Sequence, residues 1–236
     1  MSQVKGFNAI KRKLVIVAIS AMMIMPAAAA SFSETKRLAE RGDVEAQVSI
    51  GLMYNMGESV DQDYRKAMEW YLKAAAQNEA VAQYNIGVLY SDGYGVRQDY
   101  TKAVEWYLKA AAQNHSDAQY NMGVFYSNGF GVNKDYTKAA EWYLKAAKQG
   151  HSNAQAIIGG MYTLEIGVAE DYAKAMEWFK KSANQDNANG QSGMGALYAY
   201  GLGVRQDLKK AKEWFGKSCD NGSQDGCDRY ADLNTR

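Results

Sequence analysis

Few residues in this chain have types and spacings that could support chemistry. The two histidines, His115 and His151, lie 36 residues apart, and imidazole pairs are common metal ligands. The same position elsewhere in the chain holds Glu79, Asn187 and Ser223. Because the position accepts such different side chains and a metal site needs more ligands than two, we predict a surface position, no metal site and no cofactor.

A possible nucleophile motif lies at Ser33 and Lys36, which match the S-x-x-K pattern of β-lactamases and penicillin-binding proteins. The same pattern also occurs at Ser2 and Lys5, and the S-D-N and K-T-G motifs of those enzymes are absent. A four-residue match of this kind carries little information. We therefore predict no catalytic residue.

Glutamate precedes lysine by four residues at five places, which could be taken for acid–base couples. This order is also the favourable one for an exposed ion pair on a helix. We interpret the pairs as a solvated helix face, in which each contributes only a few tenths of a kcal/mol. The pairs are Glu69–Lys73, Glu105–Lys109, Glu141–Lys145, Glu177–Lys181 and Glu213–Lys217.

The elements that position these residues are set by an internal repeat. The five tryptophans are spaced by 36 residues, at 70, 106, 142, 178 and 214. Glycine recurs with the same spacing from 51, tyrosine from 54, valine from 60, aspartate from 63 and alanine from 67. A fixed period of this length is the signature of a repeat architecture.

Each repeat contains two predicted helices, which we call helix A and helix B. In the second repeat, helix A is expected over residues 82–90 and helix B over 100–113, with Asp99 as the N-cap of helix B. The recurring Gly87 lies inside helix A, where glycine costs about 1 kcal/mol relative to alanine. Its recurrence predicts a close approach between helices.

The repeats divide the chain into segments. Five units cover residues 44–223, and half-units that cover the ends of a solenoid are expected at 31–43 and 224–236. The repeats contain no proline, since the one proline of the chain is Pro26. Uninterrupted helices are therefore possible throughout the repeats. The predicted fold class is an all-α solenoid of helical hairpins.

Residues 1–30 have the pattern of a secretory signal. A basic segment, Lys11 to Lys13, precedes an apolar stretch, Leu14 to Met25, and small residues follow. Cleavage is expected near Ala29 or Ala30, and an uncleaved anchor is the alternative. A lipoprotein is excluded, because no cysteine lies at the cleavage site. The prediction is a periplasmic or secreted protein that contacts the membrane only through this segment.

Charge excludes one class of partner. Four of the 27 basic residues and none of the 26 acidic residues lie in residues 1–30, so the remainder has a formal charge of −3. Nucleic-acid binding calls for a basic surface. We therefore predict no nucleic-acid partner.

The repeat resembles the Sel-one-like repeat family, relatives of the tetratricopeptide repeats. The resemblance implies a right-handed superhelix that holds other proteins as an adaptor. Glu165 and Ser59 replace loop glycines of the pattern, so their loops are expected to differ in shape. The third unit carries the motif as Ala118, Met122-Gly123, Tyr126, Gly129, Gly131-Val132, Asp135, Ala139, Trp142-Tyr143 and Lys145-Ala146-Ala147.

The cysteines add a second resemblance. Secreted cysteine-rich members of the family join the two helices of a hairpin through a C-x7-C disulfide, and Cys219 and Cys227 have this spacing. The resemblance implies a disulfide, which an oxidising compartment would permit. Two free thiols or a metal site are the alternatives.

The predicted function is an exported scaffold that presents a concave surface to a protein or peptide. Positions that vary between repeats face the partner, whereas fixed positions pack. The alternative for the tyrosines of this set is packing against the next hairpin, and the rival function is an enzyme acting on cell-wall material or β-lactams. The candidate binding residues are Val48, Ser49, Tyr84, Asn85, Val88, Tyr120, Asn121 and Val124.

Overall fold

The computed structural model describes residues 31–235, and this range contains twelve helices and no strand. The A helices are α2, α4, α6, α8 and α10, and the B helices are α3, α5, α7, α9 and α11. The bounds in chain order are α1 (Phe32–Glu40), α2 (Val44–Met56), α3 (Tyr64–Ala76), α4 (Ala80–Asp92), α5 (Tyr100–Ala112), α6 (Ser116–Asn128), α7 (Tyr136–Lys148), α8 (Ser152–Leu164), α9 (Tyr172–Ala183), α10 (Ala188–Tyr200), α11 (Leu208–Asp220) and α12 (Gln224–Asn234).

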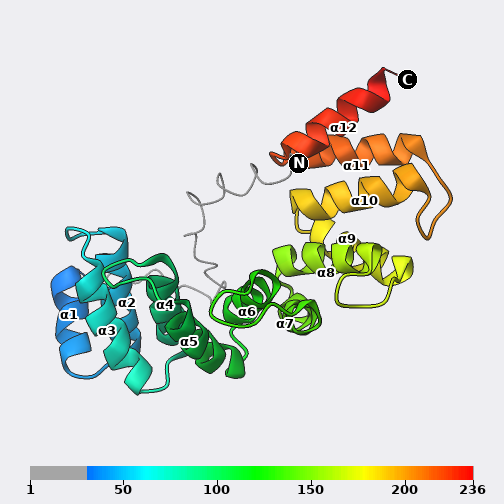
Figure 1. Ribbon diagram of the computed structural model, residues 1–236. Coiled ribbons are helices and arrows are strands. Elements are labelled where there is room, and N and C mark those ends of the chain that lie inside the picture. Colours follow the sequence, from blue (N-terminus) through cyan, green and yellow to red (C-terminus); the bar gives the residue numbers. More distant parts are fainter. Residues whose placement is uncertain (1–30, 236) are drawn as a thin grey trace.

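The helices form an arc of hairpins, which Figure 1 shows running from α1 at the left to α12 at the upper right. Each helix packs against the preceding and the following helix, so contacts stay within neighbouring hairpins. This arrangement confirms the predicted all-α solenoid. The predicted signal at residues 1–30 lies outside the described residues. Among residues 31–235, every helix is too short or too polar to cross a membrane.

The recurring glycine of helix A makes room for an aromatic ring of helix B. A methyl group on Gly87 would lie 2.6 Å from the Tyr107 ring, and one on Gly123 would lie 2.6 Å from the Tyr143 ring. Tyr107 is only 2% exposed. The close approach predicted from the glycine spacing is therefore confirmed, and the ring that requires it is now identified.

The aspartate before each helix B is its N-cap, as expected for Asp99. The Asp99 side chain accepts a hydrogen bond from the Lys102 amide at 3.0 Å. The loop between helix A and helix B contains residues in the left-handed conformation. Glu165 and Ser59 have φ values of +55° and +66°, which match the glycines at the same positions of other repeats. The expectation that these two loops differ in shape is wrong, because both residues adopt the left-handed conformation of the glycines that they replace.

A buried glutamine recurs in each helix A, and in the third and fourth repeats it links three helices. Gln119, on α6, donates a hydrogen bond to the Ala111 carbonyl on α5 at 3.2 Å. Its side-chain oxygen accepts one from the Gln149 amide, at the end of α7, at 2.7 Å. Gln155 makes the equivalent pair of bonds with Ala147 and Gln185. Because the side chain is buried with both of its polar atoms bonded, it fixes the position of one hairpin on the next.

The lysines of the B helices lie on tryptophan rings, a contact that the sequence analysis did not foresee. Lys73 lies 3.6 Å from the centre of the Trp70 ring, and Lys109 lies 3.9 Å from that of Trp106. Of the five expected Glu–Lys pairs, only Glu177–Lys181 forms an ion pair within the described residues. A tryptophan face attracts an ammonium group at least as well as an exposed carboxylate does.

Candidate functional site

A groove of about 860 Å³ runs along the A helices and is lined by side chains of α2, α4, α6 and the first turn of α8. Five of the eight predicted binding residues line it: Tyr84, Asn85, Val88, Tyr120 and Asn121. The candidate residues of the second and third repeats therefore lie together on one concave surface.

The other three predicted residues lie outside the lining. Val48 and Val124 are half-buried and pack against the hydrophobic core. The Ser49 hydroxyl donates to the Glu45 carbonyl at 2.8 Å. Their side chains therefore serve local packing and the helix backbone.

Two tyrosine–histidine stacks form part of the groove wall. The Tyr84 ring lies 4.7 Å from the His115 ring at an angle of 18°, and the Tyr120 ring lies 4.5 Å from the His151 ring at 13°. Each stack joins a helix A to the start of the next helix A. The tyrosines thus pack against the following hairpin, as the alternative interpretation had it, and also line the groove.

The histidines are N-caps rather than free surface residues. His115 Nδ1 accepts from the Ala118 amide at 3.3 Å, and His151 Nδ1 accepts from the Ala154 amide at 3.2 Å. Since Nδ1 accepts, the ring proton of His151 lies on Nε2, which is 3.3 Å from Asp117 Oδ1. The position tolerates Glu79, His, Asn and Ser because each supplies an acceptor for a helix start.

Burial and hydrogen bonding shift the acidities of the groove residues. Burial raises the pKa of Tyr84 far above that of a free phenol, and burial lowers the pKa of His115 from 6.5. The hydrogen bond from His151 lowers the pKa of Asp117. At neutral pH the groove therefore contains neutral Tyr84 and His115 rings beside the ionised Asp117 carboxylate.

The groove ends where the A helices carry small residues in place of the tyrosines. Ala156 and Ser192 take the places of Tyr84 and Tyr120 in the fourth and fifth repeats. Gly193 lies directly on the Phe179 ring, where a methyl group would have no space. Accordingly α10 packs directly on α8, whereas the A helices of the first three repeats are held further apart.

The repeats match a known family. The Sel1 repeat model matches residues 44–79, 80–115, 116–151, 152–187 and 188–223, which is most of the chain. The chain belongs to the Sel1 repeat family. The five matches are contiguous and together span residues 44–223.

Solved structures show the same fold. A Sel1 repeat protein from Oxalobacter formigenes is 34% identical, with a TM-score of 0.77, over 83% of this chain and 79% of that one. A protective antigen of uropathogenic Escherichia coli with an SLR fold is 34% identical, with a TM-score of 0.53, over 85% of this chain and 51% of that one. Mouse protein sel-1 homolog 2 is 56% identical over 41 residues, which are 17% of this chain and 6% of that protein.

Sequence reasoning missed Asp117 and the tyrosine–histidine stacks. The signal for the stacks was present inside the chain, because tyrosine and histidine 31 residues apart occur together in the second and third Sel1 repeats. The other repeats have neither residue, and hold Val48 with Glu79, Ala156 with Asn187, and Ser192 with Ser223. Such paired variation between repeats indicates contact.

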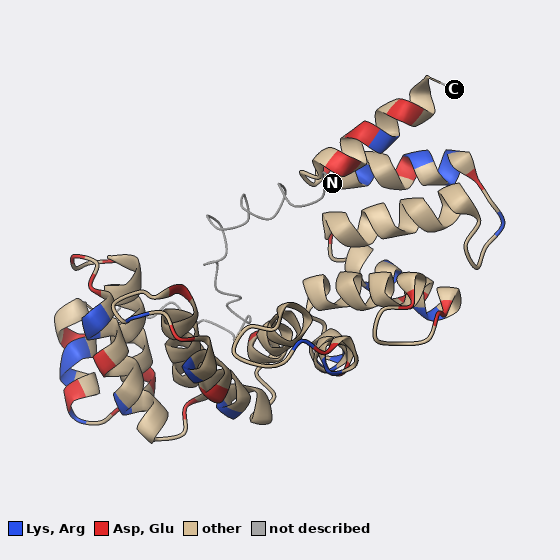
Figure 2. Ribbon diagram, viewed as in Figure 1, with Lys and Arg blue, Asp and Glu red and all other residues tan. Residues whose placement is uncertain are grey.

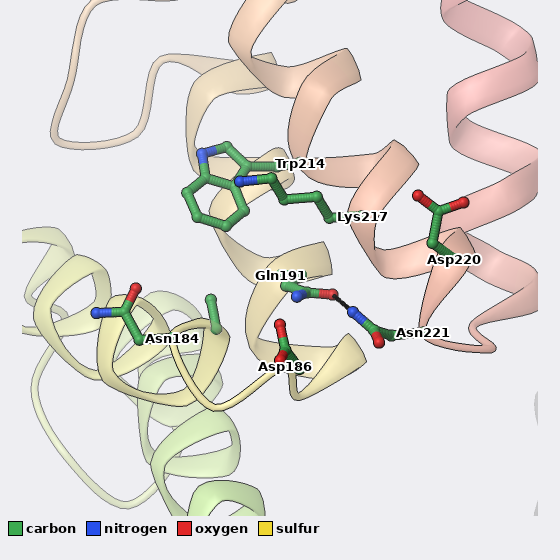
Figure 3. A pocket seen from close by; sticks show the side chains of 8 residues that line it. Asn184, Asp186, Gln191, Trp214, Lys217, Asp220 and Asn221 are labelled. Atoms are coloured by element: carbon green, nitrogen blue, oxygen red, sulfur yellow. Dashed lines mark hydrogen bonds between the residues drawn. The ribbon is translucent and has the colours of Figure 1, made fainter.

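A second, smaller hollow of about 320 Å³ lies between the end of α9 and α11. Figure 3 shows Lys217 extended along the Trp214 ring on one side of it, and the Gln191–Asn221 hydrogen bond, of 3.0 Å, on another. These contacts repeat the lysine–tryptophan and glutamine links of the other Sel1 repeats. The hollow is therefore explained by repeat packing.

The residues considered for catalysis and metal binding are not brought together. The Ser33 hydroxyl lies 2.8 Å from that of Ser31, while the Lys36 ammonium pairs with Glu40 at 3.8 Å. Among residues 31–235, no group of three or more His, Cys, Asp or Glu side chains could hold a metal ion. Neither observation favours the rival enzymatic function.

Cys219 and Cys227 form the disulfide that the resemblance implied, with their Cα atoms 4.5 Å apart. Cys227 occupies the position of the buried glutamine, and Cys219 occupies that of its alanine partner, as in Gln119 and Ala111. The bond therefore replaces the glutamine hydrogen bond of the other Sel1 repeats by a covalent link of the same eight-residue span.

Proposed function

We propose that this Sel1 repeat protein is an exported scaffold, periplasmic or secreted, that holds an extended segment of a protein partner in the groove of the A helices. The observation that carries the proposal is the groove itself, a concave surface of about 860 Å³ that extends over four repeats. Concave solenoid faces are the usual binding surfaces of repeat proteins.

The chemistry of the lining supports a peptide occupant. Its polar groups are mainly amides and phenols, including Asn85, Asn121, Gln149 and Asn153. Amide side chains both donate and accept hydrogen bonds, so they can pair with the N–H and C=O groups of an extended backbone. The aromatic rings beside them supply apolar contact area.

Two features support export. The first is the secretory pattern of residues 1–30. The second is the Cys219–Cys227 bond, since disulfides persist in oxidising compartments and are rare in the cytosol. Mass spectrometry of the mature protein is expected to show a start near Ala30 or Ser31, and a mass that includes residues 14–25 would contradict cleavage.

The binding function is tested by affinity capture from a periplasmic extract with identification by mass spectrometry. The groove variant is Asn85→Ala with Asn121→Ala. The matched control is Asn128→Ala with Asn133→Ala, because the Asn85 and Asn128 side chains each bond a carbonyl four residues earlier in the helix and the control pair lies outside the groove. The wild type and the control should capture the same partner, and the groove variant should lose it. Equal capture by all three proteins would exclude the groove.

A further inference from the structure

The charges of the molecule are distributed unevenly between the two sets of helices. Figure 2 shows charged residues along the B helices and the loops, while α8 and α10 carry none. None of the five A helices contains lysine or arginine. The groove that they line accordingly has no cation, and its one charged side chain is Asp117.

Asp117 lies in the first turn of α6, where the helix dipole favours a carboxylate, and no lysine or arginine among residues 31–235 forms an ion pair with it. Its side chain is 29% exposed, and its Oδ1 lies 3.3 Å from His151 Nε2. His151 Nδ1 accepts from the Ala154 amide, so that Nε2 faces the Asp117 carboxylate as a donor. The hydrogen bond occupies Oδ1 and leaves Oδ2 for a further donor.

The surroundings strengthen any ion pair formed at this carboxylate. The Tyr84–His115 and Tyr120–His151 stacks belong to the same lining as Asp117, whose carboxylate is partly buried. Opposite charges attract more strongly where the local dielectric constant is low. A cationic side chain also gains where it meets the electron-rich face of one of these rings.

We propose that the groove selects a segment carrying an arginine or lysine side chain, which is anchored by Asp117. This inference rests on the proposed function and adds the chemistry of the partner. Acidic segments are disfavoured, because the lining offers them no cation and places Asp117 in their path. Neutral segments would leave the carboxylate partly desolvated and unpaired.

The test uses a random-peptide phage library selected on the full chain and on Asp117→Asn. Asparagine keeps an oxygen for the His151 bond and stands naturally at the equivalent position, Asn153. Asp228→Asn, on the exposed face of α12, is the control. We expect the wild type and the control to enrich peptides with an arginine or lysine at one fixed position, and Asp117→Asn to lose this enrichment.

A synthetic peptide from the selection then gives the magnitude by fluorescence anisotropy. Either Asp117→Asn or replacement of the peptide arginine by citrulline should weaken binding about tenfold or more, as loss of one partner of a partly buried ion pair does. Selected peptides without a fixed cation, lost only in the Asn85→Ala with Asn121→Ala variant, would overturn this inference and leave the proposed function standing. Failure to select any groove-dependent peptide would overturn both.

Discussion

Ser182 and Gly190 face each other across the turn between α9 and α10, where the absence of a side chain on Gly190 leaves room for the Ser182 side chain. A methyl group on Gly190 would lie 2.6 Å from Ser182 Cβ, and the Ser182 hydroxyl donates to the Ser152 carbonyl at 2.8 Å. The first three repeats have alanine at both positions. Ser218 and Gly226 repeat the exchange at the next turn.

This pairing predicts a coupled mutant cycle. Gly190→Ala should lower the free energy of unfolding by about 1–3 kcal/mol through overpacking. Adding Ser182→Ala recreates the alanine pair of the first repeats, so the double variant should recover about 1 kcal/mol relative to additivity. Urea denaturation measures both. The control is Gly160→Ala, whose methyl group meets nothing within 4 Å and which should stabilise by about 0.5–1 kcal/mol; strict additivity would disprove the pairing.

The glutamine link predicts a large effect from one buried amide. Gln119→Leu should cost about 1–3 kcal/mol, because the Ala111 carbonyl loses its donor in a buried place and the part-buried Gln149 amide loses its acceptor. Gln98→Leu removes a hydrogen bond of similar length at an exposed loop and should cost less. If guanidinium denaturation gave equal losses for the two variants, the link would not fix the hairpins.

The loop after α8 predicts a stabilising substitution. Glu165 holds a left-handed conformation, with φ +55°, which costs a residue with a side chain about 1–2 kcal/mol. Glu165→Gly should therefore raise the free energy of unfolding by about 1 kcal/mol after the greater freedom of glycine in the unfolded chain is counted. Gly167→Ala, with φ +69° and a methyl group 2.9 Å from the Thr137 amide, should have the opposite effect. If Glu165→Gly lowered the free energy of unfolding, the Glu165 side chain would stabilise the fold by more than the backbone strain destabilises it.

Buried His115 predicts a loss of stability at mildly acidic pH. Burial lowers its folded-state pKa below the value of 6.5, so the unfolded chain binds the proton more readily. Its contribution is complete above about pH 6.5 and is lost as the pH falls towards the folded-state pKa. The melting temperature should decline from pH 8 to pH 5.5, and less steeply in His115→Asn, since Asn187 caps α10 in the same way. Parallel profiles would show that His115 does not contribute.

The disulfide predicts different outcomes for two replacements. Cys219→Ser with Cys227→Ser should cost about 2–3 kcal/mol through the greater freedom of the unfolded chain. Cys219→Ala with Cys227→Gln installs the residues of the other Sel1 repeats and should recover about 1 kcal/mol, the value of one hydrogen bond. Thermal denaturation compares the two variants. Equal melting temperatures would show that the terminal hairpin does not accept the glutamine link.

Periodicity predicted the helices, the Asp99 cap and the close approach at Gly87, because each depends on one residue type at a fixed place in the repeat. It did not predict which partner Lys109 chooses, since Glu105 and Trp106 are both within reach on one helix and the alternatives differ little in energy. In the groove, Tyr84 and Asn85 were predicted from their variation between repeats. His115 and Asp117 were not, because their contacts cross between hairpins whose spacing depends on the side chains themselves.

The tyrosine–histidine stacks make the groove a property of individual repeats. In the second and third repeats the two residues of each stack, 31 positions apart, line the groove, whereas the fourth and fifth repeats have small residues in the place of the tyrosine. Ala156→Tyr with Asn187→His would thus extend the groove towards α10. Gly193, which lets α10 approach the Phe179 ring, would also have to be replaced by a larger residue. The length of the groove can therefore change by substitution alone, without insertion or loss of a repeat.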